Sequence, residues 1–214
     1  MKRIARNLSL VATVGLCSTA VVAHAGDGKA NAAHHEIHAN NDSNEYQRAV
    51  MAGDVINEMM TGEDQEIPEA LLEKANGIAV IPHVVKGAFV VGGQFGKGIV
   101  TQRLADGTWS RPVFVDLGSV SYGFQAGVEA TDVVLVFLER DGLNSLLDDA
   151  LKLGANASVA AGPVGRSAEA GTNLTLDSAI YAYSRSKGVF AGIAVDGAVL
   201  SMDDSANQRC TARR

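Results

Sequence analysis

The sequence is poor in cysteine, in aromatic residues and in cations. Its 214 residues include two cysteines, one tryptophan and 5% aromatic residues in all. Cys17 lies in a segment that we expect to be removed, so the mature chain keeps Cys210 and cannot form an intramolecular disulfide. The 18 Lys and Arg residues are outnumbered by 24 Asp and Glu residues. This acidic balance argues against nonspecific binding to nucleic acid, which needs a basic surface.

Catalytic motifs are also missing. Residues 184–187 read S-x-x-K, as in penicillin-recognising enzymes, but the companion K-T-G and S-D-N strings are absent. Residues 92–98 superficially resemble a phosphate loop, yet Gly98 follows Lys97 where that loop needs Ser or Thr. We interpret residues 92–98 as the glycine-rich end of a hairpin that presents Lys97. The sequence therefore predicts a protein that is not an enzyme and has no cofactor.

One group of residues has metal-ligand chemistry. His34, His35, Glu36 and His38 lie close together, and His34 and His38 would share a face if the segment were helical. The surrounding segment is polar and without periodicity, so only a weak surface site could form there. We assign no metal site.

The N-terminus has the layout of a signal peptide. Lys2, Arg3 and Arg6 precede an apolar stretch over residues 8–23, and Ala23-His24-Ala25 is a small-residue cleavage site. We expect residues 1–25 to be removed near Ala25 and the mature protein to be periplasmic or secreted. Because this segment carries three cations and no acids, the mature chain would have 15 Lys and Arg against 24 Asp and Glu.

The remaining chain is long enough for one domain with a sizeable core. We expect a disordered linker over residues 26–44 and a single domain over residues 45–214. Apolar periodicity predicts a helix from Tyr46 to Met60, proline at a first turn predicts a second helix between Ile67 and Gly77, and a third is expected from Leu143 to Leu153. Strands are expected over residues 78–81, 88–91, 99–104, 109–115, 120–128, 131–138, 157–161, 168–176, 178–183, 189–195 and 198–202.

Short turns connect most of these strands. Asp106-Gly107 and Asp196-Gly197 are hairpin signals, and short connections favour antiparallel pairing because parallel strands need long crossovers. The predicted class is α+β: a bent, mainly antiparallel sheet or partial barrel of many short strands, with two N-terminal helices and one inserted helix.

Several segments resemble one family in their residues and in their order. They are Lys74–Pro82, Gly118-Ser119 with Gly123–Gly127, Leu153–Ala161, Gly162–Arg166 and Tyr183–Gly192. Together they resemble the SYLF domain, a family of lipid-binding modules, over roughly residues 45–207. Eukaryotic members bind phosphatidylinositol lipids and some bind actin, whereas bacterial members are exported single-domain proteins. The resemblance implies a module that holds an anionic amphiphile.

Our leading hypothesis is a non-catalytic exported module that recognises an anionic lipid or phosphoinositide-like headgroup on a membrane surface. Cations near glycine-rich turns would contact the headgroup, namely Lys86, Lys97, Arg166, Arg185 and Lys187. The alternative is a structural or assembly protein of the cell envelope that binds a protein partner or a second copy of itself.

Overall fold

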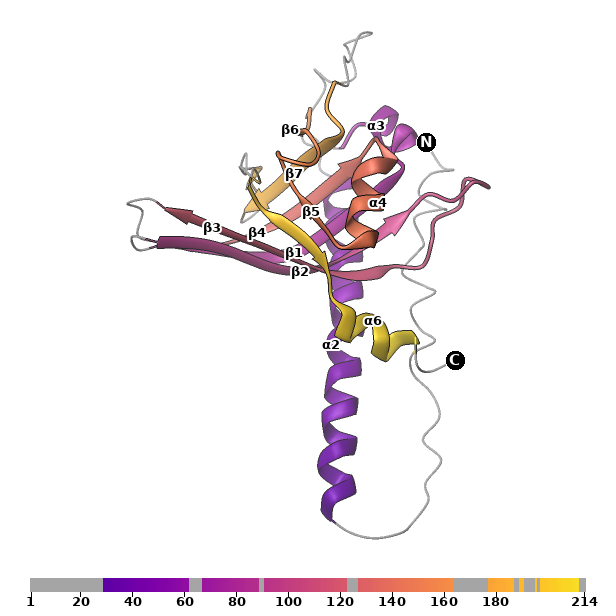
Figure 1. The fold of residues 1–214 in the computed structure, drawn as a ribbon, viewed down its shortest axis with the longest axis vertical. Coiled ribbons are helices and arrows are strands. Elements are labelled where there is room, and N and C mark those ends of the chain that lie inside the picture. The colour runs from indigo at the N-terminus through magenta and orange to yellow at the C-terminus, as the bar shows by residue number, and fades with distance from the viewer. Residues whose placement is uncertain are drawn as a thin grey trace.

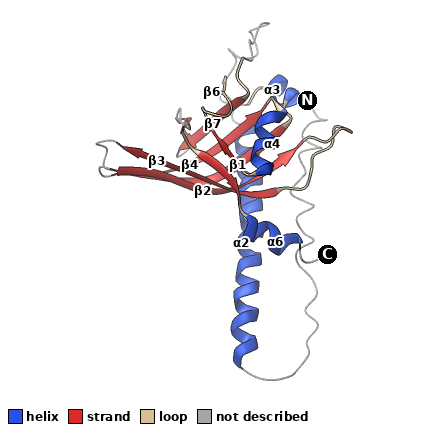
Figure 2. Ribbon diagram, viewed as in Figure 1, coloured by secondary structure: helices blue, strands red, loops and turns tan. Residues whose placement is uncertain are grey.

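A computed structural model describes residues 29–61, 67–88, 91–122, 127–163, 177–186, 189–190, 195 and 197–211; the side chains of residues 29–43 and of several strand-end residues lie outside this description. The helices are α2 (Lys29–Thr61), α3 (Glu69–Lys74), α4 (Arg140–Asp148) and α6 (Asp204–Thr211). The strands are β1 (Gly77–Ala88), β2 (Val91–Gln102), β3 (Val113–Tyr122), β4 (Gly127–Phe137), β5 (Ala150–Lys152), β6 (Val159–Ala161), β7 (Ile180–Ser186), β8 (Val189–Phe190) and β9 (Val199–Met202). Figure 1 shows their arrangement, and Figure 2 shows that a curled sheet forms the body of the molecule.

All nine strands of the described residues belong to one sheet. Eight follow the order β5-β9-β3-β2-β1-β4-β7-β6, and β8 pairs with β7 outside this path. Every pairing is antiparallel except that of β6 with β7, which is parallel. The predicted α+β class with a bent, mainly antiparallel sheet is confirmed.

The sheet buries apolar side chains on both faces. Alternate residues of a strand point to opposite faces, so each central strand contributes to two clusters. The face covered by α4 holds Ile81, Leu117, Val133, Leu135, Phe137, Leu143 and Leu146. The face covered by α2 and α3 holds Val55, Met59, Leu71, Ile78, Val80, Val134, Val136, Tyr181 and Tyr183. We call these the α4 face and the α2 face.

The predicted helices occur, with different boundaries. The expected linker over residues 26–44 is helical from Lys29 onward, because α2 continues toward the N-terminus without a break. This stretch contains several alanines, which favour helix, and no proline to interrupt it. The helix predicted from Leu143 to Leu153 is instead α4 followed by β5, and α6 was not predicted at all.

The remaining expected turns and strands are confirmed only in part. Asp106-Gly107 does form a turn between β2 and β3, with Gly107 at φ 82°. The strand expected over residues 120–128 is instead divided between β3 and β4, and β9, expected to form a hairpin with the preceding strand, pairs with β3 and β5. The strand expected over residues 168–176 lies outside the described residues.

The glycine-rich segment over residues 92–98, which we expected at a hairpin end, begins where Ala88 of β1 pairs with Gly92 of β2 and continues along β2. It lies inside β2, which pairs with β1 on one side and β3 on the other. β1 is bulged between Val80 and Val85, and His83 within this bulge has φ 50°, in the left-handed region. The backbone of the bulge lies in close contact with β2, where a Cβ atom on Gly98 would overlap the carbonyl oxygen of Val80. Glycine is therefore required at this point for backbone contact.

This crowding predicts that Gly98→Ala lowers the free energy of unfolding. Overpacking of this kind costs about 1–3 kcal/mol, measurable by urea denaturation. Gly118→Ala on the neighbouring strand β3 is the matched control, because a Cβ atom there meets nothing within 4 Å. Equal stability of the two variants would show that the bulge does not need Gly98.

Candidate functional site

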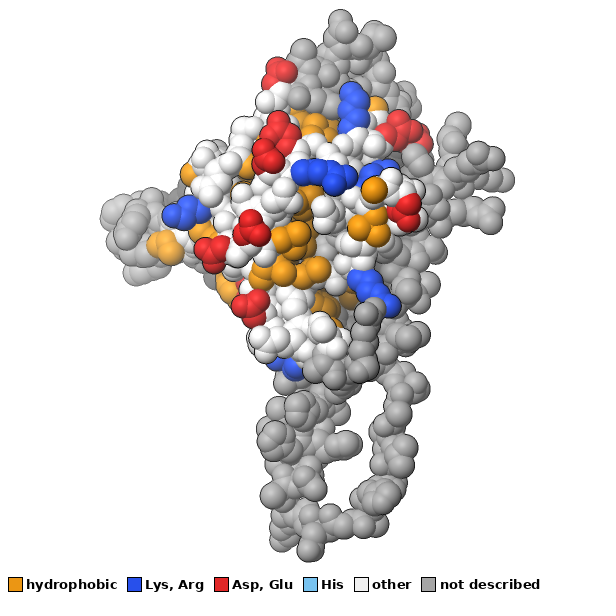
Figure 3. All heavy atoms as spheres, turned by 45° about the vertical axis from the view of Figure 1, so that its right-hand side comes forward, with side chains coloured by type: hydrophobic (Ala, Val, Ile, Leu, Met, Phe, Trp, Pro, Cys, Tyr) orange, Lys and Arg blue, Asp and Glu red, His pale blue; other side chains and the backbone are white. Residues whose placement is uncertain are grey.

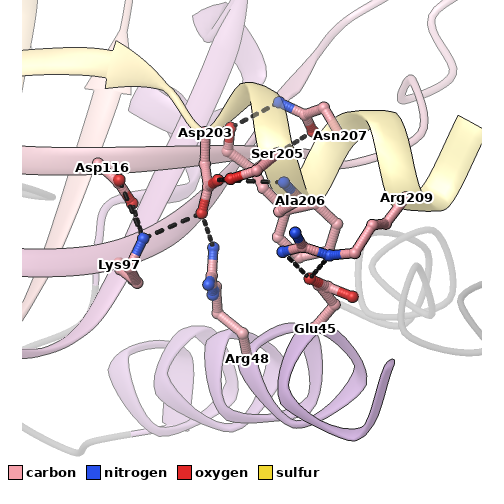
Figure 4. Close-up of polar contacts among 10 residues, drawn as sticks. Glu45, Arg48, Lys97, Asp116, Asp203, Ser205, Ala206, Asn207 and Arg209 are labelled. Carbon is pink, nitrogen blue, oxygen red and sulfur yellow. Dashed lines mark hydrogen bonds and ion pairs between the residues drawn. The ribbon is translucent and has the colours of Figure 1, made fainter. Parts of the chain in front are cut away.

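The most extensive polar contacts of the described chain converge on Asp203, between β9 and α6 (Figure 4). Its Oδ2 atom accepts hydrogen bonds from Arg48 Nη1 of α2 and Lys97 Nζ of β2, both at 3.0 Å. Lys97 also contacts both carboxylate oxygens of Asp116 on β3, at 2.8 and 2.9 Å. We call Arg48, Lys97, Asp116 and Asp203 the Asp203 cluster. It joins segments 155 residues apart in the chain.

The Asp203 carboxylate also begins α6. Its Oδ1 atom accepts bonds from the Ser205 hydroxyl at 2.9 Å and the Ala206 amide at 3.1 Å, as a helix N-cap does. Burial opposes the charged form of Asp203, but the bonds from Ala206, Lys97, Arg48 and Ser205 outweigh it and hold the pKa of Asp203 well below its usual range. The pKa of Lys97 is raised because bonds to Asp116 and Asp203 outweigh its desolvation. Both groups are therefore charged in the folded state.

Two further contacts fasten α6 to its surroundings. The Asn207 amide group bonds the backbone of Phe114 twice, with the Phe114 N–H donating at 2.8 Å and the Phe114 carbonyl accepting at 2.9 Å. Arg209 donates from Nε and Nη2 to Glu45 Oε1 on α2, at 2.9 and 2.6 Å. Segment 203–209 thus holds α2, at Glu45 and Arg48, against strands β2 and β3.

The structure does not unite the cations that we predicted as headgroup ligands. Lys97 belongs to the Asp203 cluster, and Arg185 Nη1 pairs with Glu58 Oε2 at 2.7 Å. Lys86 is exposed and lies opposite Gln94 of β2, so these two side chains share a face of the sheet. Gln94 and Lys97 are three residues apart on β2, and therefore Lys86 and Lys97 point to opposite faces. Arg166 and Lys187 lie outside the described residues. The assignment of these five cations as headgroup ligands stays a prediction.

A charged row crosses the α2 face at the level of the β1 bulge. Lys97 lies opposite Asp116, and Asp132 lies opposite Arg185. Between these pairs, the His83 amide of the bulge donates to Asp132 Oδ1 at 2.8 Å. We call these five residues the charged row. Its charges alternate in sign, so the row forms a polar border rather than a cationic patch.

An apolar strip lies beside this row, on the part of the sheet that α2 leaves uncovered. Val85 of β1 is directly opposite Phe95 of β2. Val120 of β3 is opposite Gly93, two residues along β2 from Phe95, so Val120 and Phe95 are diagonal neighbours on the same face. The three residues are 47%, 55% and 73% exposed, respectively. The ends of β2 and β3 that carry part of this strip project away from the body at the left of Figure 1. The strip is a contiguous apolar surface bounded by charge.

The charges on the surface are mixed elsewhere too. On the face shown in Figure 3, side chains of both signs are interspersed around a central group of apolar ones. A surface of this kind has no large field of one sign to attract an anion over a distance.

Alternative chemistries lack a site among the described residues. Ser184, the serine of the S-x-x-K string, lies within strand β7 and is 4% exposed, so no substrate reaches it. No group of three His, Cys, Asp or Glu side chains in the described part could hold a metal, although His34 and His38 have side chains outside that part. None of the described helices is both long and apolar enough to cross a membrane.

Comparison with known proteins decides the family. The family model described as "Ysc84: Las17-binding protein actin regulator" matches residues 118–213. The chain belongs to the Ysc84 (SYLF) family. The resemblance stated from the sequence motifs is thereby confirmed.

Members of the Ysc84 family from yeast and human are similar to most of this chain. LAS seventeen-binding protein 3 of Saccharomyces cerevisiae is 37% identical over 172 residues, which cover 77% of this chain and 37% of that protein. Protein YSC84 of the same yeast is 39% identical over 160 residues, 71% of this chain and 34% of that protein. Human SH3 domain-containing YSC84-like protein 1 is 34% identical over 149 residues, 69% and 43% of the two chains. This chain therefore spans less than half the length of these relatives.

Sequence reasoning missed most of the Asp203 cluster. From the sequence we assigned no role to Asp203, yet its side chain is 6% exposed and accepts hydrogen bonds on both oxygens. The local signal was present, since Asp203 followed by Ser205 and Ala206 has the chemistry of a helix N-cap. The pairing with Arg48 had no local signal.

We expect Asp203→Asn to lower the free energy of unfolding by roughly 3 kcal/mol at neutral pH, because it leaves Arg48 buried without its carboxylate partner. Asn keeps the helix cap, so the loss reports the charge contacts. Because folding lowers the pKa of Asp203, its contribution is present above about pH 4 and is lost as the pH falls below that value.

Urea denaturation at neutral pH and at about pH 2 measures this difference. Asp204→Asn is the control, because the exposed neighbour loses the same charge outside the cluster. A difference between wild type and Asp203→Asn that stays constant with pH would contradict the charged role of Asp203.

Proposed function

We propose that this Ysc84-family chain is a non-catalytic binding module for the surface of an anionic amphiphile. The observation that carries the proposal is the apolar strip bordered by the charged row. Phe95 and Lys97 are two positions apart on one face of β2, a separation of about 7 Å along the strand. The strip can meet the apolar part of an amphiphile while the row stays at the level of its headgroups.

The strip contains the residue types that such a contact needs. Phe95 supplies a large apolar side chain, and Lys97 Nζ lies 5.7 Å from the centre of its ring. Burial of apolar surface contributes about 25 cal/mol per Å², so a few partly exposed side chains give a weak, reversible contact. Specificity for anionic headgroups then has to come from cations near the strip. We expect export to the periplasm or outside the cell, as the N-terminal segment predicts.

A second candidate is supported by the names of the relatives. LAS seventeen-binding protein 3 is named for binding Las17, and the family description adds an actin regulator. These names describe binding proteins and no enzyme, which supports a non-catalytic role here. They also favour a protein partner, or a second copy of this chain, as an occupant of the same apolar strip.

Co-sedimentation with lipid vesicles tests the first candidate. We expect the wild type to bind vesicles that contain phosphatidylglycerol, and Phe95→Thr with Val120→Thr to bind them on the order of tenfold more weakly, because about 1.4 kcal/mol of apolar contact is lost. Threonine keeps the strand preference at both positions. Leu147→Gln is the matched control, since Leu147 is 43% exposed on α4 at the other face of the sheet.

Two outcomes count against the amphiphile. Wild-type protein that stays in solution with every vesicle composition would overturn it. Light scattering that shows concentration-dependent association, removed by the same double substitution, would assign the strip to a second copy of the chain instead.

A further inference from the structure

The surroundings of Asp203 have the chemistry of a phosphate site. Arg48 Nη1 and Lys97 Nζ converge on one carboxylate oxygen, and the Ser205 hydroxyl and Ala206 amide converge on the other. Charge-assisted bonds from Arg and Lys are the contacts that proteins make to phosphate oxygens, whereas the Ser205 and Ala206 donors cap α6 and belong to the segment that carries the carboxylate. Here a carboxylate of the same chain accepts the bonds from both cations. Arg48 and Lys97 come from α2 and β2, so the cation pair does not depend on the segment that carries the carboxylate.

The segment that carries Asp203 is weakly anchored by apolar contacts. Helix α6 has eight residues, well below the length at which an isolated helix is stable, and Ala206 is the buried residue among them. Polar contacts therefore hold α6 in place. One of these is incomplete, because Glu45 bonds Arg209 through Oε1 while its buried Oε2 atom has no hydrogen-bond partner in the described structure. A buried acceptor without a partner costs free energy.

The cation pair lies next to the apolar strip. Lys97 is on the same face of β2 as Phe95, and its ammonium group lies over the Phe95 ring. Arg48 is almost buried and lies over the ring of Phe114, 5.2 Å from its centre. With Asp203 in place, three acceptor atoms take up the three donors of Lys97. The Lys97 side chain is 41% exposed and the Arg48 side chain 11%, so an anionic headgroup at the strip would have to displace Asp203 to bond both cations together.

We propose that Asp203 is an internal stand-in for a phosphate group, and that movement of α6 uncovers a phosphate-binding site formed by Arg48 and Lys97. The inference deepens the proposed function, on which it rests, by assigning the headgroup contact and its regulation. In the closed state the chain meets an amphiphile through the apolar strip alone. A phosphate that replaces Asp203 adds the charge contact and releases α6 from α2. The chemistry is that of a phosphate group, whether on a lipid or free in solution.

The first test compares Asp203→Asn with Asp204→Asn, which have the same net charge. Asn caps a helix as well as Asp does but no longer competes for the cations. We expect Asp203→Asn to bind inorganic pyrophosphate, measured by calorimetry, on the order of tenfold more tightly than Asp204→Asn or wild type, the gain of one charge-assisted contact. Adding Arg48→Gln to Asp203→Asn should remove the gain. Equal affinities of Asp203→Asn and Asp204→Asn would overturn the inference.

The second measurement uses the unmodified chain and does not depend on the folding of a variant. Pyrophosphate should accelerate amide hydrogen exchange in residues 204–211 relative to sodium chloride at the same ionic strength, because the anion competes with Asp203 for Arg48 and Lys97. Exchange in β4 at the centre of the sheet should not change. Exchange in residues 204–211 that is the same in both salts would contradict the release of α6.

Vesicles separate this inference from the proposed function. If Asp203→Asn gains affinity for both pyrophosphate and phosphatidylglycerol vesicles, the site takes a lipid headgroup. If it gains affinity for pyrophosphate while no form of the chain binds vesicles, the phosphate site stands and the amphiphile proposal fails. If the wild type binds vesicles and Asp203→Asn gains nothing with either probe, the amphiphile proposal stands and the phosphate site fails.

Discussion

The buried carboxylate of Asp203 is the contact on which the arrangement of α2, α6 and strand β2 depends. It compensates Arg48 and Lys97, and it provides the first cap of α6. A buried ion pair gains little over well-packed apolar residues, but breaking one leaves an uncompensated charge at high cost. The charges of Arg48, Lys97 and Asp203 therefore fix the positions of α2 and α6 more than they raise the free energy of unfolding. Because Arg48 and Lys97 need an anion between them, we propose that another anion can compete with Asp203 for this position.

The two faces of the sheet differ in how fully they are covered. The α4 face is buried by α4 and by the curvature of the sheet, with most of its side chains fully covered. On the α2 face, the helix covers residues up to the charged row, and the apolar strip continues beyond it. The bulge in β1 creates this border, because it places His83 beside Asp132 and requires glycine at position 98 of β2. The strained, glycine-lined centre of the sheet thus positions the surface that we assign to binding.

Much of the fold could be predicted because its signals are local. Asp106-Gly107 predicts a turn, the periodicity of Tyr46–Met60 predicts a helix, and runs of β-branched residues predict strands. Gly96 and Gly98 of β2 were misread, since their cause is a bulge in another strand. The Asp203 cluster could not be predicted, because it joins residues 106 and 155 positions apart that no local pattern connects. A cation that looks available in the sequence, such as Lys97, can be neutralised in the fold by an acid far along the chain.

A double-mutant cycle on Arg48 and Asp203 tests the central claim most directly. The free energies of unfolding of wild type, Arg48→Met, Asp203→Asn and the double variant give the coupling between the two side chains. The buried contact predicts a favourable coupling of about 1–3 kcal/mol, with the double variant more stable than the sum of the single effects implies. Additive effects would contradict the account, because they would show that Asp203 and Arg48 do not hold each other in the folded chain.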